Sequence, residues 1–325
     1  MLDSIDQLIQ IVLNNGKQII LIQIAFTVAL KSFTLIPYWF LLVSISFGLI
    51  YKYSIRYNLP NDWTELNEND ICLITGGSNG LGLEIVKNLL AKKVIVYNFD
   101  ISPSDHDHAV NFIKCNIGIE EELKFELNKL IESLRSKNKY ISIVINNAGI
   151  RDNRPLITLP SDRIHQIINV NLFSQIWIQQ TVLNNHLQNN PNGKLSIVNM
   201  SSILGTFAPK NLSIYCGSKA ASIQIHDALV QEFKRHEKIR FLLITTGQLN
   251  TSMFNDVIPS RLWFAPIVDK DYLSNLILEK INTGYSGIIC EPFYANFLPS
   301  LRCFPMWFQD LCRYISEIDD KIKEH

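Results

Sequence analysis

The chain has 325 residues, of which 47% are hydrophobic and only 18% charged, and 30 acidic side chains balance 30 basic ones. Nucleic-acid-binding proteins normally carry a basic surplus, so this balance argues against a nucleic-acid partner. The length suffices for one large domain and an additional segment. Because the 6 cysteines and 7 histidines show no spacing typical of a metal site, we predict no bound metal.

The N-terminal part of the chain is the most apolar. Residues 33–51 are all uncharged, which is long enough for a helix to cross a bilayer, and a shorter apolar run precedes them at 18–30. A cleaved signal peptide is disfavoured because the apolar region is too long and begins too late. A soluble core helix is also disfavoured, since the domain that follows looks complete without it. We therefore predict a membrane anchor within residues 1–58.

The topology of this anchor stays open. A single span is the simplest interpretation, and Lys52 and Arg56 after it favour a C-terminal domain in the cytosol. A hairpin formed by both apolar runs would also keep both ends cytosolic. The endoplasmic reticulum or a lipid droplet is the membrane we expect. The polar residues 59–70 are predicted to link the anchor to a domain at 71–325.

A nucleotide site is predicted at the start of that domain. The apolar run 71–75 leads into TGGSNGLG at 75–82 and then into a segment with helical apolar spacing. Glycines allow close approach to a pyrophosphate, and the helix N-terminus offers free N–H groups. The candidate cofactor-binding residues are Thr75, Gly76, Ser78, Asn79, Gly80, Leu81 and Gly82.

The second predicted strand, residues 94–99, is followed by Asp100. An acid at this position accepts hydrogen bonds from the adenosine ribose and repels a 2′-phosphate. No Arg or Lys lies within 75–82 or directly after Asp100, so NAD(H) is favoured over NADP(H) as the cofactor. The alternative is that Asp100 merely ends the strand.

The glycine turn resembles the TGxxxGxG turn of the short-chain dehydrogenase/reductase family, and further motifs of that family follow in order across 69–287. This resemblance implies an α/β fold, a Rossmann-type doubly wound parallel sheet with the site at the strand C-terminal ends. The NNAG at 146–149 is similar to the family's motif beside the adenosine ribose, which implies cofactor contacts from Asn147, Ala148 and Gly149. Asn116 stands where family members usually have Asp beside the adenine.

The catalytic candidates also follow from the resemblance. Ser202, Tyr215 and Lys219 match the family's Ser–x12–Tyr–x3–Lys set in identity and spacing. The match implies that Ser202 holds the substrate oxygen, that Tyr215 moves its proton, and that Lys219 contacts the nicotinamide ribose. Because Tyr215 and Lys219 share a helical face, we expect the ammonium to lower the pKa of the phenol. Asn171 matches the structural Asn whose backbone carbonyl holds a relay water.

The segment 245–254 is similar to the family's loop over the nicotinamide. Gly247 and Thr251 match it and imply cofactor contacts, whereas Thr246 replaces the usual Pro and is expected to loosen the loop. Arg151 and Arg154 follow NNAG in a loop that could border the substrate; surface solvation is the favoured interpretation.

Residues 252–325 are expected to shape the substrate pocket. The stretch 261–268 is predicted to be a pocket wall, and the aromatic stretch 293–308 is either a membrane-contact surface or ordinary core. The functional interpretations of both favour a lipophilic substrate. The anchor and this tail together resemble the membrane-anchored branch that contains 17β-hydroxysteroid and retinol dehydrogenases and fungal relatives, and the Asn/Ile/Lys-rich composition fits a fungal member.

The predicted function is that of a membrane-anchored oxidoreductase. It transfers a hydride between a nicotinamide cofactor and a lipophilic alcohol or ketone of the sterol, retinoid or long-chain type. The alternative is a non-catalytic NAD-binding membrane scaffold or sensor that retains the fold; intact Ser202, Tyr215 and Lys219 argue against it. The sequence leaves open the substrate, the direction of reaction and whether the chain forms a homodimer.

Overall fold

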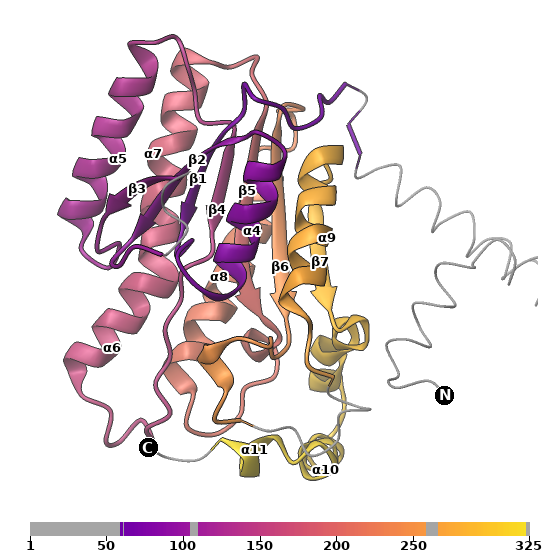
Figure 1. Ribbon diagram of the computed structural model, residues 1–325. Coiled ribbons are helices and arrows are strands. Elements are labelled where there is room, and N and C mark those ends of the chain that lie inside the picture. The colour runs from indigo at the N-terminus through magenta and orange to yellow at the C-terminus, as the bar shows by residue number, and fades with distance from the viewer. Residues whose placement is uncertain (1–58, 61, 105–109, 258–265, 323–325) are drawn as a thin grey trace, which may run out of the picture.

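The computed structural model describes residues 59–60, 62–104, 110–257 and 266–322 (Figure 1). The predicted anchor, residues 1–58, lies outside the described residues. Among the residues that are described, no helix is both long and apolar enough to cross a membrane.

The described residues form a parallel sheet with helices on both faces, as predicted. Its order is β3-β2-β1-β4-β5-β6-β7, and every neighbouring pair is parallel. The strands β2 and β3 are added on one side of β1, and β4 to β7 are added on its other side. In such folds ligands bind beyond the carboxyl ends of the strands at the point where the order switches, here between β1 and β4. The strands are β1 (Ile71–Thr75), β2 (Ile95–Asp100), β3 (Asn111–Lys114), β4 (Ile143–Asn146), β5 (Leu195–Ser202), β6 (Ile239–Thr246) and β7 (Gly287–Glu291).

The helices cover the sheet in two layers (Figure 1). One face packs against α4 and α9, and the other packs against α5, α7 and α8. The helices are α4 (Gly80–Ala91), α5 (Glu120–Arg135), α6 (Ser161–Ile168), α7 (Ser174–Asn189), α8 (Ser213–Glu232), α9 (Lys270–Thr283), α10 (Met306–Ser316) and α11 (Ile318–Lys321).

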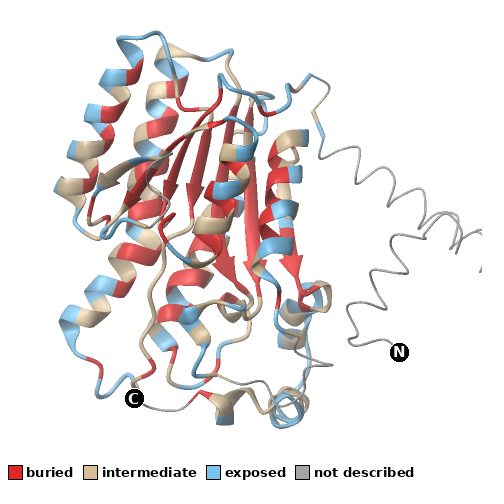
Figure 2. Ribbon diagram, in the orientation of Figure 1, coloured by how far each residue is buried: buried red, intermediate tan, exposed pale blue. Residues whose placement is uncertain are grey.

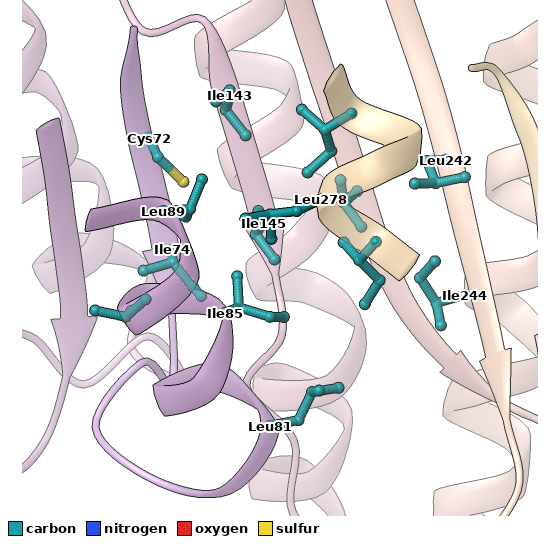
Figure 3. Close-up of a cluster of buried hydrophobic side chains, with 14 of the residues drawn as sticks. Cys72, Ile74, Leu81, Ile85, Leu89, Ile143, Ile145, Leu242, Ile244 and Leu278 are labelled. Atoms are coloured by element: carbon teal, nitrogen blue, oxygen red, sulfur yellow. The ribbon is translucent and has the colours of Figure 1, made fainter. Parts of the chain in front are cut away.

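The core follows the two-residue repeat of the strands. In β1, Cys72 and Ile74 point to the α4 and α9 side (Figure 3), whereas Ile71 and Leu73 point to the side of α5 and α7. All four are at most 1% exposed. The central strands are therefore buried on both faces, as Figure 2 shows in red, and this explains their continuous apolar runs.

Part of the predicted linker, residues 59–70, packs on the domain. The Trp63 indole N–H donates to the Ile281 carbonyl at 3.1 Å, and the Leu66 amide donates to the Asn282 side chain at 2.9 Å. The Asp70 carboxylate is buried and pairs with Lys194 at 2.8 Å. The segment thus ties the edge of β1 to α9 and β5.

The aromatic stretch near the C-terminus lies mostly at the surface. It forms a 3₁₀-helical segment, η5 (Phe293–Cys303), and the start of α10. Phe297, Met306 and Trp307 are each more than 60% exposed. The prediction of ordinary core is therefore wrong for Phe297, Phe304, Met306 and Trp307, and the other large apolar side chains of this stretch are half-buried.

Candidate functional site

At the glycine turn after β1, backbone segments of the site pack closely against one another. Gly76 and Gly80 have φ angles of +67° and +57°, a region that side chains other than glycine rarely adopt. At Gly82 a Cβ atom would lie 2.1 Å from the Gly76 carbonyl oxygen. The first turn of α4 is therefore pressed against the end of β1, and its residues Gly80 and Leu81 line the cavity. The first N–H groups of a helix have no partner within the helix and can bind an anion. This cradle fits a pyrophosphate.

A buried asparagine that sequence reasoning missed holds this turn. Asn98 in β2 accepts a hydrogen bond from the Gly77 amide at 2.8 Å and donates one to the Ser78 hydroxyl at 3.0 Å. Ser78 is itself buried, and its amide donates to the Asp100 carboxylate at 3.1 Å. The sequence signal that could have identified this role is the polar Asn98 within the otherwise apolar run of β2.

The NNAG segment after β4 is fastened to the same turn. The Asn147 side chain donates to the carbonyls of Thr75 and Gly76 at 3.1 and 2.9 Å. The Thr75 hydroxyl accepts from the amides of Asn147 and Ala148, both at 3.2 Å. Thr75 thus joins the ends of β1 and β4 from beneath the site.

The three catalytic candidates meet beyond the ends of β5 and β6. Ser202 is the last residue of β5, and its hydroxyl donates to the Thr246 carbonyl at 3.3 Å. Tyr215 and Lys219 lie in α8, one turn apart, with the Lys219 ammonium 5.8 Å from the Tyr215 ring centre. Lys219 also donates to the Met200 carbonyl at 2.8 Å. All three side chains are buried.

Asn171 lies in a π-helical turn, Asn169–Phe173, between α6 and α7. Such turns occur often at functional sites. Its fully buried side chain bonds both the amide and the carbonyl of Ile150 at 2.8 Å, and it donates to the Ser218 hydroxyl at 3.2 Å. Asn171 therefore connects the loop after β4 to the catalytic helix.

Burial dominates the electrostatics of the two titratable side chains. It raises the pKa of Tyr215 to about 12, and a hydrogen bond with Ser202 and the charge of Arg151 offset this only in part. Burial also lowers the pKa of Lys219 to about 8. Lys219 is not among the groups that lower the pKa of Tyr215 in this structure, so the expectation that its ammonium brings the phenol toward neutrality stays a prediction.

The loop after β6 is held more firmly than the loss of its proline suggested. The Gly247 amide donates to the Glu291 carbonyl at 2.7 Å, and a Cβ at Gly247 would lie 2.8 Å from Pro292.

The favoured interpretation of Arg151 as a solvated surface residue is wrong. Its guanidinium lies 4.4 Å from the Phe254 ring centre and pairs with Asp256. Arg154 pairs with Asp152 instead.

A cavity of about 840 Å³ runs along the carboxyl ends of the strands, and most of the predicted site residues line it. Thr75, Ser78, Gly82 and Asn171 are not among its lining residues; they support its walls, and their predicted roles stay predictions. Its lining includes Gly76, Asn79, Gly80, Leu81, Asp100, Asn116, Asn147, Ala148, Gly149, Ser202, Tyr215, Lys219, Gly247 and Thr251.

The C-terminal helices line the far end of the same cavity. Cys312 and Ile315 of α10 face it, as do Ile318 and Ile322. Ile322 is 4% exposed and packs in one apolar cluster with Tyr215. Of the predicted wall at 261–268, residues 261–265 lie outside the described residues and Pro266 lines the cavity.

The sequence profile of the short chain dehydrogenase family matches residues 70–261, more than half of the chain. The chain belongs to this family. The family predicted from the motifs is therefore confirmed, and with it an oxidoreductase that uses a nicotinamide cofactor. Among its relatives is an uncharacterized oxidoreductase of Saccharomyces cerevisiae, TDA5, which is 36% identical over 79% of this chain and 79% of the relative.

More distant proteins share the fold of this dehydrogenase. Human retinol dehydrogenase 10 is 22% identical over 72% of this chain and 79% of its own length. The structure of 4-hydroxyisoleucine dehydrogenase complexed with NADH aligns with a TM-score of 0.59 and 22% identity, covering 68% of this chain and 97% of that one. A Burkholderia cenocepacia short chain dehydrogenase in complex with NADP aligns with a TM-score of 0.61 and 18% identity, covering 77% of this chain and 98% of that one.

The close approach at Gly82 makes a direct prediction. Gly82→Ala is expected to raise the Kd for NADH more than tenfold, because the added methyl group must displace the Gly76 carbonyl. Gly217→Ala, between Tyr215 and Lys219 in α8, is the control, since a Cβ there meets nothing within 4 Å. Fluorescence titration measures both. Equal affinities for the two variants would contradict the assigned cradle.

Burial of Lys219 predicts a pH-dependent stability. The folded pKa of about 8 lies below the unfolded value of roughly 10.4, so the unfolded chain binds more protons between these values and stability rises with pH. From pH 7.5 to 9.5 the wild type should gain about 2 kcal/mol relative to Lys219→Met in urea unfolding. The buried cysteines are common to both proteins and cancel in this difference. A parallel pH response of the two proteins would contradict the prediction.

Proposed function

We propose that this dehydrogenase is a membrane-anchored, NAD(H)-preferring enzyme that interconverts a lipophilic alcohol and its carbonyl form. One observation carries the proposal: Ser202, Tyr215 and Lys219 line a cavity whose other end is formed by apolar side chains of the C-terminal helices. The substrate carbon thus lies beside the proton-transferring group while its apolar body contacts α10 and the residues after it.

The chain's own residues supply the proton chemistry. The Tyr215 hydroxyl donates a proton to the substrate oxygen during reduction and takes it back during oxidation. The Ser202 hydroxyl, at the end of β5, holds that oxygen by a hydrogen bond. Lys219, buried behind Tyr215, keeps a cationic ammonium near the phenol as charge develops there. A nicotinamide cofactor bound in the cradle supplies or accepts the hydride.

The preference for NAD(H) is supported by the position of Asp100. Its carboxylate ends β2, lines the cavity, and is held by the amides of Ser78 at 3.1 Å and Ile101 at 2.8 Å. A fixed carboxylate repels the 2′-phosphate of NADP and accepts hydrogen bonds from a free ribose hydroxyl. The glycine turn itself contributes no Arg or Lys to neutralise a phosphate.

Two features support a lipophilic substrate and a membrane location. Residues 33–51 carry no charge and suit a spanning helix. On α10, Trp307, Leu311 and Tyr314 follow the helical repeat and are 67%, 43% and 79% exposed. Cys312 and Ile315, on the adjoining side of this helix, line the cavity, so an apolar substrate dissolved in a membrane has a short path to Tyr215. Retinol dehydrogenase 10 among the relatives agrees with this substrate class.

The decisive experiment is a turnover panel. Purified protein is assayed with sterols, retinoids and long-chain alcohols, each with NAD and with NADP. We expect turnover of at least one lipophilic alcohol with the lower KM for NAD, and a loss of 10²- to 10⁴-fold in Tyr215→Phe. Tyr140→Phe, distant from the cavity, serves as the matched control. Turnover that survives Tyr215→Phe would overturn the mechanism, and equal use of both cofactors would overturn the preference.

Membrane anchoring is tested by carbonate extraction of the full chain. We expect the protein in the membrane pellet, and we expect Leu41→Lys combined with Leu42→Lys to release it, since each charge at a helix centre costs about 3 kcal/mol. Leu8→Lys, outside the long apolar run, should leave it in the pellet. Release of the unaltered chain by carbonate would contradict an integral anchor.

A further inference from the structure

Arg151 joins two loops that lie far apart in the sequence. It follows the NNAG segment after β4, and it reaches the loop at 251–257 after β6. Its side chain is only 12% exposed, although it carries a full charge and lies in a loop. A guanidinium buried to this extent needs several partners, because an unpaired buried charge is costly.

The guanidinium has a partner on each side. Its Nε donates to the Met253 carbonyl at 2.6 Å, and its two terminal nitrogens contact Asn153 and Asp256. Asn153, itself buried, donates to the second Asp256 oxygen at 2.9 Å, so the carboxylate is held from both sides. The planar fork of arginine satisfies this set, whereas the single ammonium of lysine does not.

The same contact reaches the catalytic tyrosine through one aromatic ring. Phe254 lies between the Arg151 guanidinium, 4.4 Å from its centroid, and the Tyr215 ring, 6.0 Å away in an edge-on arrangement. Phe254 also packs against the apolar cluster that contains Tyr215 and Ile322. A displacement of the loop would therefore remove a packing partner from the catalytic side chain.

The clamped loop also covers the cofactor side of the cavity. The Thr251 methyl group would lie 3.4 Å from a Cβ at Gly80, and the Met253 terminal methyl 4.0 Å from one at Gly149. Both glycines belong to the predicted cofactor-binding segments. The loop thus reaches from the glycine turn to NNAG, with Arg151 fastening it in the middle.

We propose that Arg151 is a positioning residue that clamps the loop 251–257 over the cofactor and holds Phe254 against Tyr215. This inference rests on the proposed oxidoreductase function and adds the residue that closes its site. The positive charge of Arg151 also acts to lower the pKa of Tyr215.

Arg154 offers a matched control on the same loop. It pairs with Asp152 at 2.6 Å, and Asp152 is also held by Arg163 at 3.1 Å. Neither contact involves residues 251–257. Replacing Arg154 therefore removes an arginine and an ion pair from this loop while leaving the clamp in place.

The experiment compares Arg151→Ala, Arg151→Lys and Arg154→Ala in the full chain. Hydrogen–deuterium exchange reports on peptides covering 251–257, titration gives the Kd for NADH, and kcat is normalised to the folded fraction. For Arg151→Ala we expect faster exchange in this loop, a Kd raised at least tenfold and a kcat lowered at least tenfold. Arg151→Lys should recover these values only in part, and Arg154→Ala should match the wild type.

The outcomes separate the possible failures. Unchanged loop exchange, Kd and kcat in Arg151→Ala would overturn the clamp. A merely structural role would lower the melting temperature but leave the Kd and kcat of the folded fraction unchanged, and this result would overturn the clamp as well. If Arg151→Ala does not fold, Asp256→Asn removes the ion pair with little change of shape and faces the same criteria. Failure of wild-type protein to bind NADH would instead contradict the proposed function.

Discussion

A reciprocal pair of hydrogen bonds between strand β5 and helix α8 determines the geometry of the site. The Lys219 ammonium donates to the Met200 carbonyl at 2.8 Å, and the Ser201 hydroxyl donates to the Lys219 carbonyl at 3.0 Å. These bonds fix the first turns of α8 against the end of β5. Because Ser202 follows directly in the strand and Tyr215 lies one turn back in the helix, the same two bonds bring the hydroxyl groups of these two catalytic candidates together.

The tightness that creates this geometry also opposes proton transfer. Desolvation disfavours the phenolate of Tyr215 and raises its pKa to about 12. It also disfavours the ammonium of Lys219 and lowers its pKa to about 8. The groups that stabilise charge here are fixed dipoles and nearby cations rather than water. An environment of this kind requires little reorganisation when charge develops, which is where electrostatic catalysis gains most.

The sequence predicted the parts of the molecule that depend on local pattern. The apolar runs and the glycine turn predicted strands and a nucleotide site from local pattern, and the family resemblance implied the parallel sheet and the meeting of Ser202, Tyr215 and Lys219 at its edge. Asn98 was missed and Arg151 was assigned to the solvated surface because their contacts are with partners distant in sequence. The raised pKa of Tyr215 was not predicted, because burial is a property of the whole packed site.

The cavity is built from two parts of the chain, one inside the range matched by the family profile and one beyond it. The family profile ends at residue 261, yet Cys312, Ile315, Ile318 and Ile322 line the end of the cavity away from the glycine turn. The candidate catalytic and cofactor-binding residues therefore lie in the segment shared with the family, and the segment that follows contributes further apolar lining to the cavity. Mutations in α10 and α11 could alter which molecule is accepted while the reacting groups stay in place, so specificity in this chain can evolve, or be engineered, separately from catalysis.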